Sequence, residues 1–207
     1  MPHEQIHDDH APIEDVRYGD DELLEIAIRA LLIEKNVLTA EQVNRQIDNM
    51  DSRNPALGAR VIARAWYDKR FRERLIDEPL VAIELEFDMP MTGPLELVVL
   101  ENKPQIHNVV VCTLCSCYPR MLLGIPPAWY KATEYRSRVV REPRAVLSEF
   151  GLELPDNVEV RVSDSTADLR YLVLPLRPAG TEGWSEDQLA AIVTRDCMIG
   201  TAIPRSE

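Results

Sequence analysis

Several features that mark other classes of protein are absent from this chain of 207 residues. No apolar run approaches the length of a membrane span, and the polar, acidic N-terminus over residues 1–9 lacks the apolar segment of a signal peptide. The sequence also contains no internal repeat and no low-complexity tract. We therefore expect a cytoplasmic protein with one substantial core, or with one core plus an extended arm.

Positive charge and cysteine are both scarce. The chain carries 23 Lys and Arg against 35 Asp and Glu, a formal net charge of -12, which argues against nucleic acid or an anionic membrane as the main partner. It fits better with a partner protein that supplies positive side chains. Of the 4 cysteines, all but one fall within a single short stretch, which is typical of a metal site in a reducing compartment and not of a secreted disulfide framework.

Helical patterns dominate the first part of the chain. From residue 20 onward, apolar residues recur on one face of a helix. Thr39 with Gln42 forms a capping box, and Asn54 followed by Pro55 is a typical helix start. We expect a flexible tail over residues 1–19 and an N-terminal helical arm over 20–89. Within the arm, one helix should begin near residue 20, a second should cover 40–50 and a third should cover 55–76.

The rest of the chain mixes strand and helix patterns. Proline and glycine break the helical pattern near 90–94, and runs of apolar or β-branched residues then predict strands. The expected strands cover 95–100, 106–111, 158–162 and 169–174, and the expected helices cover 134–150 and 185–195, with a short one opened by Pro127. This order predicts an α+β chain in which residues 90–207 form a layered α/β metal-binding domain.

The stretch Cys112-Thr113-Leu114-Cys115-Ser116-Cys117 carries the chemistry. Its sulfur donors crowd one another, and Cys115 and Cys117, with only Ser116 between them, cannot form an unstrained disulfide. A metal ion would relieve this crowding, because it lowers the thiol pKa values and takes up negative charge. Sulfur ligands favour a soft or borderline transition metal.

The cysteine motif alone leaves several kinds of site open. A structural zinc site needs four ligands, so Cys197 or His107 would have to complete it, although these are more simply a buried apolar side chain and a structural histidine. An iron–sulfur cluster needs four cysteines with another spacing, and a redox C-x-x-C pair leaves Cys117 unexplained. The tail histidines are most simply part of a solvated arm (His3, His7, His10).

Longer strings around the cysteines narrow the choice. They are Val-Val-Val-Cys-Thr-Leu-Cys-Ser-Cys-Tyr-Pro ending at Pro119, Leu-Gly-Ile-Pro-Pro-Ala-Trp-Tyr-Lys over 123–131, Tyr-Arg-Ser-Arg-Val-Val over 135–140, Arg170-Tyr171, Arg-Pro-Ala-Gly-Thr-Glu-Gly-Trp over 177–184 and Thr-Arg-Asp-Cys-Met-Ile-Gly over 194–200. Together they strongly resemble the metal-binding subunit of the nitrile hydratases. The likeness covers most of the chain from residue 20 onward, and its cysteine motif is highly specific.

The resemblance implies a low-spin Co(III) or Fe(III) ion. Its ligands would be the sulfurs of Cys112, Cys115 and Cys117 and the deprotonated backbone amides of Ser116 and Cys117. Threonine at Thr113 marks the cobalt type, where the iron type has serine. The family oxidises two of the thiolates, which implies sulfinate at Cys115 and sulfenate at Cys117. Thiolates and amide anions are strong donors, so they stabilise a trivalent metal with one open position.

The resemblance also implies an enzyme that adds water to a small nitrile to give the amide, with Cys117, Cys115 and Ser116 as catalytic residues. The metal acts as a Lewis acid, the sulfenate oxygen of Cys117 serves as nucleophile or base, and Ser116 positions water. Arginines of a beta-type partner subunit hold the oxidised sulfurs, so activity requires that partner. An accessory activator protein would load the metal, and a chain produced alone would be apo or would carry zinc.

Two departures from the common nitrile hydratase pattern leave the substrate open. The chain has Arg120-Met121 where many members have Trp-Pro, and Cys197 where most have serine. Both make it similar to the metal-bearing subunit of thiocyanate hydrolase, a three-subunit relative, and to three-subunit nitrile hydratases such as the one that acts on toyocamycin. A cobalt nitrile hydratase is the first hypothesis and a thiocyanate hydrolase the second. The third, from another class, is a non-catalytic, zinc-stabilised interaction module.

Further residues are expected near the metal or its pocket (Thr113, Arg120, Trp129, Arg170). Arg120 would reshape the pocket or favour an anionic or polar substrate, or it would lie at a subunit interface. Arg170 lies inside a predicted strand, where an unpaired charge is costly, so it either supports the oxidised cysteines or forms a salt bridge. Trp129 and Tyr130 either line the pocket or pack in the core.

Overall fold

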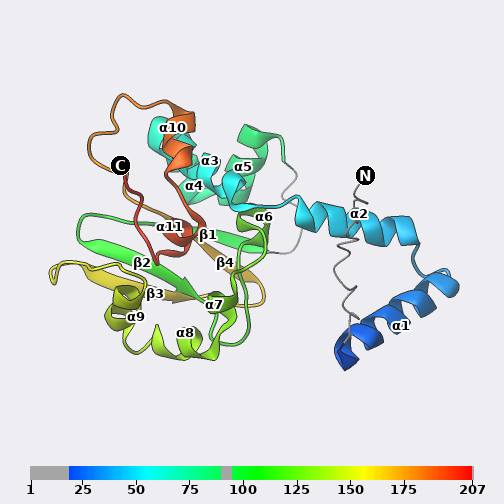
Figure 1. Ribbon diagram of the computed structural model, residues 1–207. Helices are drawn as coiled ribbons and strands as arrows, with labels where there is room; N and C mark the ends of the chain where they lie inside the picture. The colour runs from blue at the N-terminus through cyan, green and yellow to red at the C-terminus, as the bar shows by residue number, and fades with distance from the viewer. Residues whose placement is uncertain (1–18, 90–94, 207) are drawn as a thin grey trace, which may run out of the picture. The chain divides into compact units, whose positions relative to one another are not determined.

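The computed structural model describes residues 19–89 and 95–206, and it mixes helices and strands in the predicted α+β class (Figure 1). Most of the predicted tail, with its histidines, and the predicted break at 90–94 lie outside the described residues. The chain divides into two compact units between Ile47 and Asp48. Among the described residues, no helix is both long enough and apolar enough to cross a membrane.

The smaller unit contains α1 (Asp20–Glu34) and most of α2 (Ala40–Asp51). The predicted capping box of α2 is confirmed, because Thr39 N–H donates to Gln42 Oε1 at 2.8 Å and Gln42 N–H donates to Thr39 Oγ1 at 3.2 Å. No side chain of α1 is buried, and the apolar residues that predicted this helix are largely exposed.

The larger unit opens with α3 (Pro55–Tyr67), α4 (Lys69–Asp77) and α5 (Pro79–Phe87). The single helix predicted over 55–76 is wrong, because the Asp68 carboxylate caps α4 by accepting from two of its backbone N–H groups at 2.8 and 3.2 Å. The sequence pattern did not predict α5, because its own apolar residues are spread around the helix and define no single face.

These helices bury side chains in the same core as the strands that follow; Phe71 and Ile83, for example, are fully buried there. For this reason the division between compact units falls after Ile47 and not near residue 89. The limits given above for the arm (20–89) and the metal-binding domain (90–207) stay a prediction.

Strands appear at all the predicted places, and they pair in parallel. β1 (Glu96–Glu101) pairs with β4 (Leu169–Leu174), and β2 (Ile106–Val111) pairs with β3 (Glu159–Asp164). β2 is buried along nearly its whole length, which is typical of a parallel strand covered on both faces.

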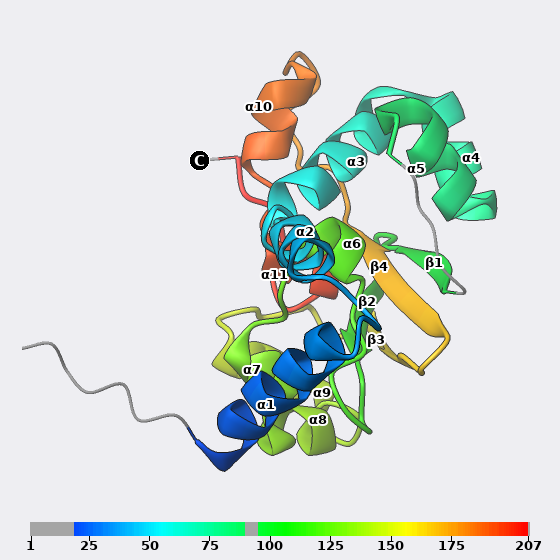
Figure 2. The ribbon, with the colours of Figure 1, turned by 90° about the vertical axis from the view of Figure 1, so that its right-hand side faces the viewer.

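Short helices complete the larger unit: α6 (Arg120–Leu123), α7 (Ala128–Lys131), α8 (Thr133–Arg138), α9 (Pro143–Glu149), α10 (Glu186–Ala191) and α11 (Arg195–Ile199). The helix predicted over 134–150 is interrupted before Pro143, because a residue preceding proline avoids the helical region. The helix predicted over 185–195 is also two helices, since Thr194 caps α11. In Figures 1 and 2, α3, α4, α5 and α10 cover one face of the strands and α7, α8 and α9 cover the other, as the layered prediction required.

Gly200 ends α11 and packs closely against the backbone of β2. Its φ is +94°, and a Cβ at this position would lie 2.0 Å from the carbonyl oxygen of Asn108, so only glycine fits. The Gly200 carbonyl oxygen lies 2.7 Å from His107 Nε2, and His107 Nδ1 lies 3.2 Å from Asn102 Nδ2. Both nitrogens of the buried imidazole are therefore engaged within the fold, and His107 is a structural histidine.

Candidate metal centre

The cysteine loop begins where β2 ends, at the carboxyl edge of the β2–β3 pair. Because the two strands run in the same direction, their last residues, Val111 and Asp164, lie opposite each other. The ladder continues one step further, since Ser165 N–H donates to the Val111 carbonyl at 2.7 Å. Cys112 is thereby placed in the buried interior, whereas Cys115 is exposed.

The loop brings its cysteine sulfurs together. Cys115 Sγ lies 3.6 Å from Cys112 Sγ and 3.3 Å from Cys117 Sγ, and all of these sulfurs lie within 4.8 Å of one another. Cys115 N–H donates to Cys112 Sγ at 3.3 Å, which closes the first turn of the loop. Within residues 19–89 and 95–206, no other His, Cys, Asp or Glu side chain joins this group.

Cys197, considered above as a fourth ligand, lies in α11 and is buried. Its Sγ is 3.2 Å from Thr194 Oγ1, and burial raises the pKa of its thiol. Like His107, Cys197 is engaged elsewhere in the fold. The sulfur group therefore does not become a four-ligand zinc site through either residue.

Contacts among the loop thiols separate their acidities. Hydrogen bonds with the Cys117 and Cys112 thiols, followed by one from the Ser116 N–H, lower the pKa of Cys115 to about 7. Burial raises the pKa of Cys117, the hydrogen bond with Cys115 acts in the same direction, and the charge of Arg170 opposes both. Cys115 therefore reaches the thiolate form, which is the metal-binding form, before Cys117 does.

Two buried tyrosines hold the backbone on either side of the cysteines. Tyr130 O–H donates to the carbonyl of Cys117 at 2.9 Å, and Tyr135 O–H donates to the carbonyl of Val110 at 2.7 Å. Burial raises the pKa of both hydroxyls far above neutrality, so both remain donors. The segment that carries α7 and α8 thus fixes the chain where it enters the loop and where it leaves it.

Thr113 is held at three of its atoms. Its N–H and its Oγ1 donate to the Asp164 carboxylate at 2.9 and 2.5 Å, and its carbonyl accepts from Arg136 Nη1 at 3.1 Å. Asp164, Arg136 and Tyr135 were not expected at the site from the sequence. A parallel pairing of the two strands that end at Val111 and Asp164 would have indicated Asp164, but local patterns do not specify which strands pair.

The other predicted neighbours of the metal have different surroundings. Arg170 donates to the carbonyls of Thr166 and Leu169, and it forms no ion pair with any described carboxylate. Trp129 packs edge-on against the rings of Tyr135 and Phe150, with centroids 4.9 and 4.8 Å apart, so core packing accounts for its contacts.

Arg120 begins α6 and is exposed, and its guanidinium has no hydrogen bond or ion pair with a described residue. Ser116 is half-buried in the loop. The catalytic, metal-binding and pocket roles expected from the sequence stay predictions for all of these residues, including Thr113.

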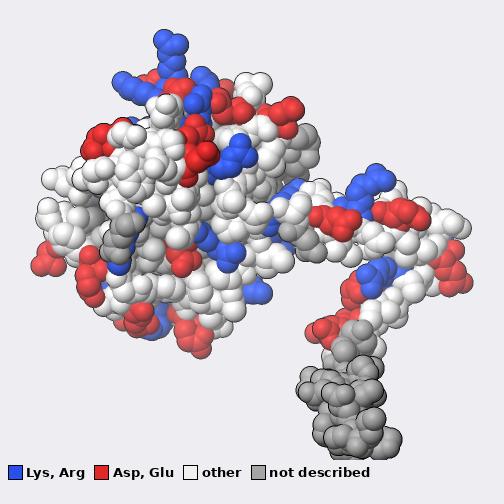
Figure 3. Space-filling model, turned by 45° about the horizontal axis from the view of Figure 1, so that its top comes forward, with Lys and Arg blue, Asp and Glu red and all other residues white. Residues whose placement is uncertain are grey.

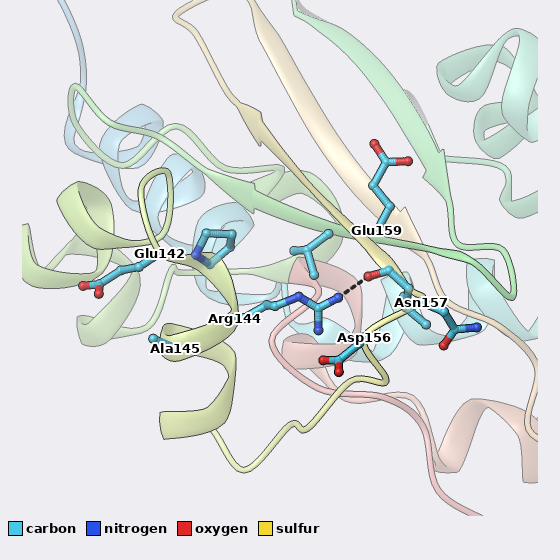
Figure 4. A pocket seen from close by; sticks show the side chains of 9 residues that line it. Glu142, Arg144, Ala145, Asp156, Asn157 and Glu159 are labelled. Carbon is cyan, nitrogen blue, oxygen red and sulfur yellow. Dashed lines mark hydrogen bonds between the residues drawn. The ribbon is translucent and has the colours of Figure 1, made fainter.

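Two other surface features lie apart from the cysteine loop. A pocket between α9 and β3 is lined in part by Arg144 (Figure 4). The Arg144 guanidinium donates hydrogen bonds to the carbonyls of Leu154, Pro155 and Val158, so its donors are already used within the fold. Acidic and basic side chains are interspersed on the face shown in Figure 3 and are not gathered into one basic patch there.

Comparison with known protein families supplies the decisive match. The family described as "Nitrile hydratase, alpha chain" matches residues 20–202 of this sequence. The chain belongs to the nitrile hydratase alpha chain family. The resemblance inferred from the strings around the cysteines is therefore confirmed.

Relatives within the nitrile hydratase alpha chain family include subunits of more than one enzyme. The chain is 46% identical over 197 residues to thiocyanate hydrolase subunit gamma of Thiobacillus thioparus, covering 90% of this chain and 81% of that one. It is 48% identical over 179 residues to the alpha subunit of the low-molecular weight cobalt-containing nitrile hydratase of Rhodococcus rhodochrous, covering 86% of each.

Solved structures of the family have the same fold. A recombinant thiocyanate hydrolase with partially modified cobalt centres has a TM-score of 0.85 at 45% identity, covering 91% of this chain and 92% of that one. A double mutant of the Fe-type nitrile hydratase of Comamonas testosteroni Ni1 has a TM-score of 0.81 at 42% identity, covering 91% and 93%. Cobalt and iron both occur among these names.

The donor atoms of this member of the family fit a soft or borderline transition metal. Cys112, Cys115 and Cys117 present their sulfurs within 4.8 Å of one another, and thiolates are the preferred ligands of such ions. The low pKa of Cys115 favours the ligating form of that thiol. These residues are therefore a candidate metal centre.

Proposed function

We propose that this chain is the metal-bearing subunit of a cobalt nitrile hydratase, which adds one water molecule across the triple bond of a small nitrile to give the amide. The observation that carries the proposal is the cysteine loop after β2, in which the sulfurs of Cys112, Cys115 and Cys117 lie within 4.8 Å of one another. Membership of the nitrile hydratase alpha chain family supports the same reaction.

In this proposal the ion is held by the sulfurs of Cys112, Cys115 and Cys117 and by the backbone amides of Ser116 and Cys117. When bound, the trivalent ion supplies Lewis acidity toward the nitrile. Burial of Cys112 excludes water from one side of the donor set, while the exposed Cys115 faces the side from which a substrate can approach. Ser116, between the two outer cysteines, positions water by hydrogen bonding.

Cys115 and Cys117 are proposed to be oxidised by dioxygen during maturation, to sulfinate and sulfenate respectively. The sulfenate oxygen of Cys117 would then act as a base that takes a proton from the attacking water, or as a nucleophile that water displaces from the carbon in a later step. Anionic sulfur oxygens require cationic donors. Arg170 already lowers the pKa of Cys117 through its charge, so it is proposed to stabilise the oxidised form of that residue.

The remaining donors are proposed to be arginines of a beta-type partner subunit, and an activator protein is proposed to load the metal. The names of the relatives, which are subunits of larger enzymes, support a partner. Leu114, in the middle of the loop, is 85% exposed, and an exposed apolar side chain beside the sulfurs suits a surface that a second subunit covers.

Cobalt is preferred to iron in this proposal because Thr113 matches the cobalt-type sequence and a cobalt-containing relative is 48% identical. Metal analysis of the chain matured beside its partner, combined with mass spectrometry of the peptide that spans Cys112 to Cys117, tests this directly. We expect cobalt, with two added oxygens on Cys115 and one on Cys117. Zinc on unmodified thiols in that sample would refute the proposal in favour of a structural zinc module.

Activity provides the second test. We expect Cys115→Ala and Cys117→Ala to abolish nitrile hydration in the assembled enzyme, because each removes one sulfur of the donor set. Cys197→Ala is the matched control, since Cys197 is buried away from the loop and should leave the metal content unchanged. Full activity of either loop variant would contradict the proposed roles.

Hydrolysis of thiocyanate is a second candidate function. It is favoured by the 46% identity to a thiocyanate hydrolase subunit and by the exposed Arg120 guanidinium near the loop, which suits an anionic substrate. Assays of the assembled enzyme with thiocyanate, a simple aliphatic nitrile and a nucleoside nitrile distinguish the substrates. If Arg120 selects the anion, Arg120→Trp should raise KM for thiocyanate more than KM for the nitriles.

A further inference from the structure

Thr113 of the cysteine loop forms hydrogen bonds with two side chains of opposite charge, Asp164 and Arg136. Both carboxylate oxygens of Asp164 accept from Thr113, one from its N–H at 2.9 Å and one from its Oγ1 at 2.5 Å. Arg136 Nη1 donates to the Thr113 carbonyl at 3.1 Å. No direct ion pair between Asp164 and Arg136 occurs among the described residues, so these charges act on the loop backbone.

Strand pairing fixes where this contact can form. Asp164 is the last residue of β3 and lies opposite Val111, the last residue of β2. Its carboxylate therefore projects at the edge where the loop starts, two positions before Thr113. Arg136 is anchored independently, since its Nε donates to the Lys131 carbonyl at 3.1 Å. The sheet and α8 thus hold Thr113 from separate parts of the fold.

The first turn of the loop needs such a restraint. Cys112 and Cys115 place their sulfurs 3.6 Å apart, although Cys115 is exposed and residues 112–119 form neither a helix nor a strand. A loop without other support would sample many shapes, and it would have to be ordered again each time a metal bound. Thr113 lies inside this turn, so fixing its N–H, hydroxyl and carbonyl also fixes the backbone that carries both cysteines.

We infer that Asp164 is a positioning residue of the metal centre: through Thr113, and braced by Arg136, it holds the Cys112–Cys115 turn in the geometry that binds metal before the ion arrives. This inference deepens the proposed function and rests on it for the identity of the ligand. The hydrogen bonds that hold Thr113 lie within this chain, so the shape of the turn can be measured apart from the metal.

Hydrogen exchange of the metal-free, full-length chain tests the inference without metal. In Asp164→Ala, amide exchange in the peptide spanning Cys112 to Cys117 should be at least about tenfold faster than in the wild type, since local opening exposes these amides. Asp164→Asn keeps one acceptor oxygen and should fall between the two. Asp168→Ala, which removes an exposed carboxylate four positions away, is the matched control and should exchange like the wild type.

Titration with Co(II) alone, under anaerobic conditions, gives a second readout through the sulfur-to-cobalt charge-transfer absorption. We expect the dissociation constant of Asp164→Ala to be about 10–100-fold higher than that of the wild type, as is typical when a residue that supports a metal ligand is removed. Thr113→Val, which loses only the hydroxyl donor, should show a smaller increase and keeps the test possible if Asp164→Ala does not fold.

The outcomes separate this inference from the proposed function. If the amides of the Cys112 to Cys117 peptide exchange in Asp164→Ala at the wild-type rate, the role of Asp164 is overturned, even if the chain binds cobalt. If Asp164→Ala does not fold, wild-type exchange rates in both Asp164→Asn and Thr113→Val overturn it. A wild-type chain without the charge-transfer absorption argues against the metal centre, whereas the exchange rates still decide whether Asp164 holds the turn.

Discussion

Replacing Tyr130 by phenylalanine should lower the free energy of unfolding measurably, because it removes one hydrogen bond. The side chain is fully buried, and its O–H donates to the carbonyl of Cys117 at 2.9 Å. Phenylalanine keeps the ring and its edge contact with Tyr118, whose centroid is 5.2 Å away, so the change removes the donor and little packing. An unsatisfied buried carbonyl costs about 1–3 kcal/mol.

Because Cys117 is only half-buried, water can partly replace the lost donor, and we place the loss of unfolding free energy at about 1–1.5 kcal/mol. For a chain of this size, each kcal/mol lowers Tm by about 2–4 °C. Urea unfolding followed by tryptophan fluorescence, together with a thermal scan, should therefore show a Tm lower by about 2–6 °C. The metal affinity should fall too, since the end of the cysteine loop is no longer held.

The chain offers a graded control series for this prediction. Tyr135→Phe removes a shorter bond, at 2.7 Å to Val110, and should cost at least as much. Tyr118→Phe removes a contact of 3.5 Å to the Leu123 carbonyl, which is at the limit of hydrogen bonding, so it should be nearly neutral. Equal losses for Tyr118→Phe and Tyr130→Phe, or no loss for Tyr130→Phe, would refute the reasoning.

Three further outcomes follow from other contacts. Gly200→Ala should lose more than about 3 kcal/mol in urea unfolding, because its Cβ would lie 2.0 Å from the Asn108 carbonyl oxygen; wild-type stability would contradict the close approach. In the metal-free chain, iodoacetamide should modify Cys115 before Cys117, at a rate that rises through about pH 7, as peptide mass spectrometry would measure; equal rates would contradict the separation of the thiols. Backbone N–H groups hold the pKa of the folded Asp68 carboxyl below its usual range, and the stability that they contribute is lost when the carboxyl is protonated. The difference in unfolding free energy between wild type and Asp68→Asn should therefore shrink as the pH falls below about 4. A difference that stays constant down to about pH 2 would contradict this contribution.

Local sequence patterns predicted the strands well, and β2 and β4 have the predicted limits. Continuous runs of apolar and β-branched residues identify a buried strand wherever it lies in the chain. Helix ends were less predictable, because a helical pattern can continue across a break. Asp68 interrupts an otherwise helical stretch by capping the helix that follows it, and Thr194 does the same before α11.

The candidate site divides in the same way. The cysteines lie within one short segment, so their crowding favoured a metal, and the longer strings around them narrowed the choice to the metal-binding subunit of the nitrile hydratases. Asp164 lies 51 residues from Thr113, and its place at the loop depends on which strands pair and in which direction. Neither is specified by local periodicity, so the residues that hold the loop became visible only in the fold.

The parallel pairing of β2 with β3 also sets an order of events during synthesis. Thr113 is made 51 residues before Asp164, which corresponds to about 3–10 s at the usual elongation rate of about 5–20 residues per second. During that interval the growing chain carries its cysteine cluster without the strand and the carboxylate that shape it. The thiols therefore precede the groups that hold them, and the contacts of Thr113 can form only after about four-fifths of the polypeptide has been made.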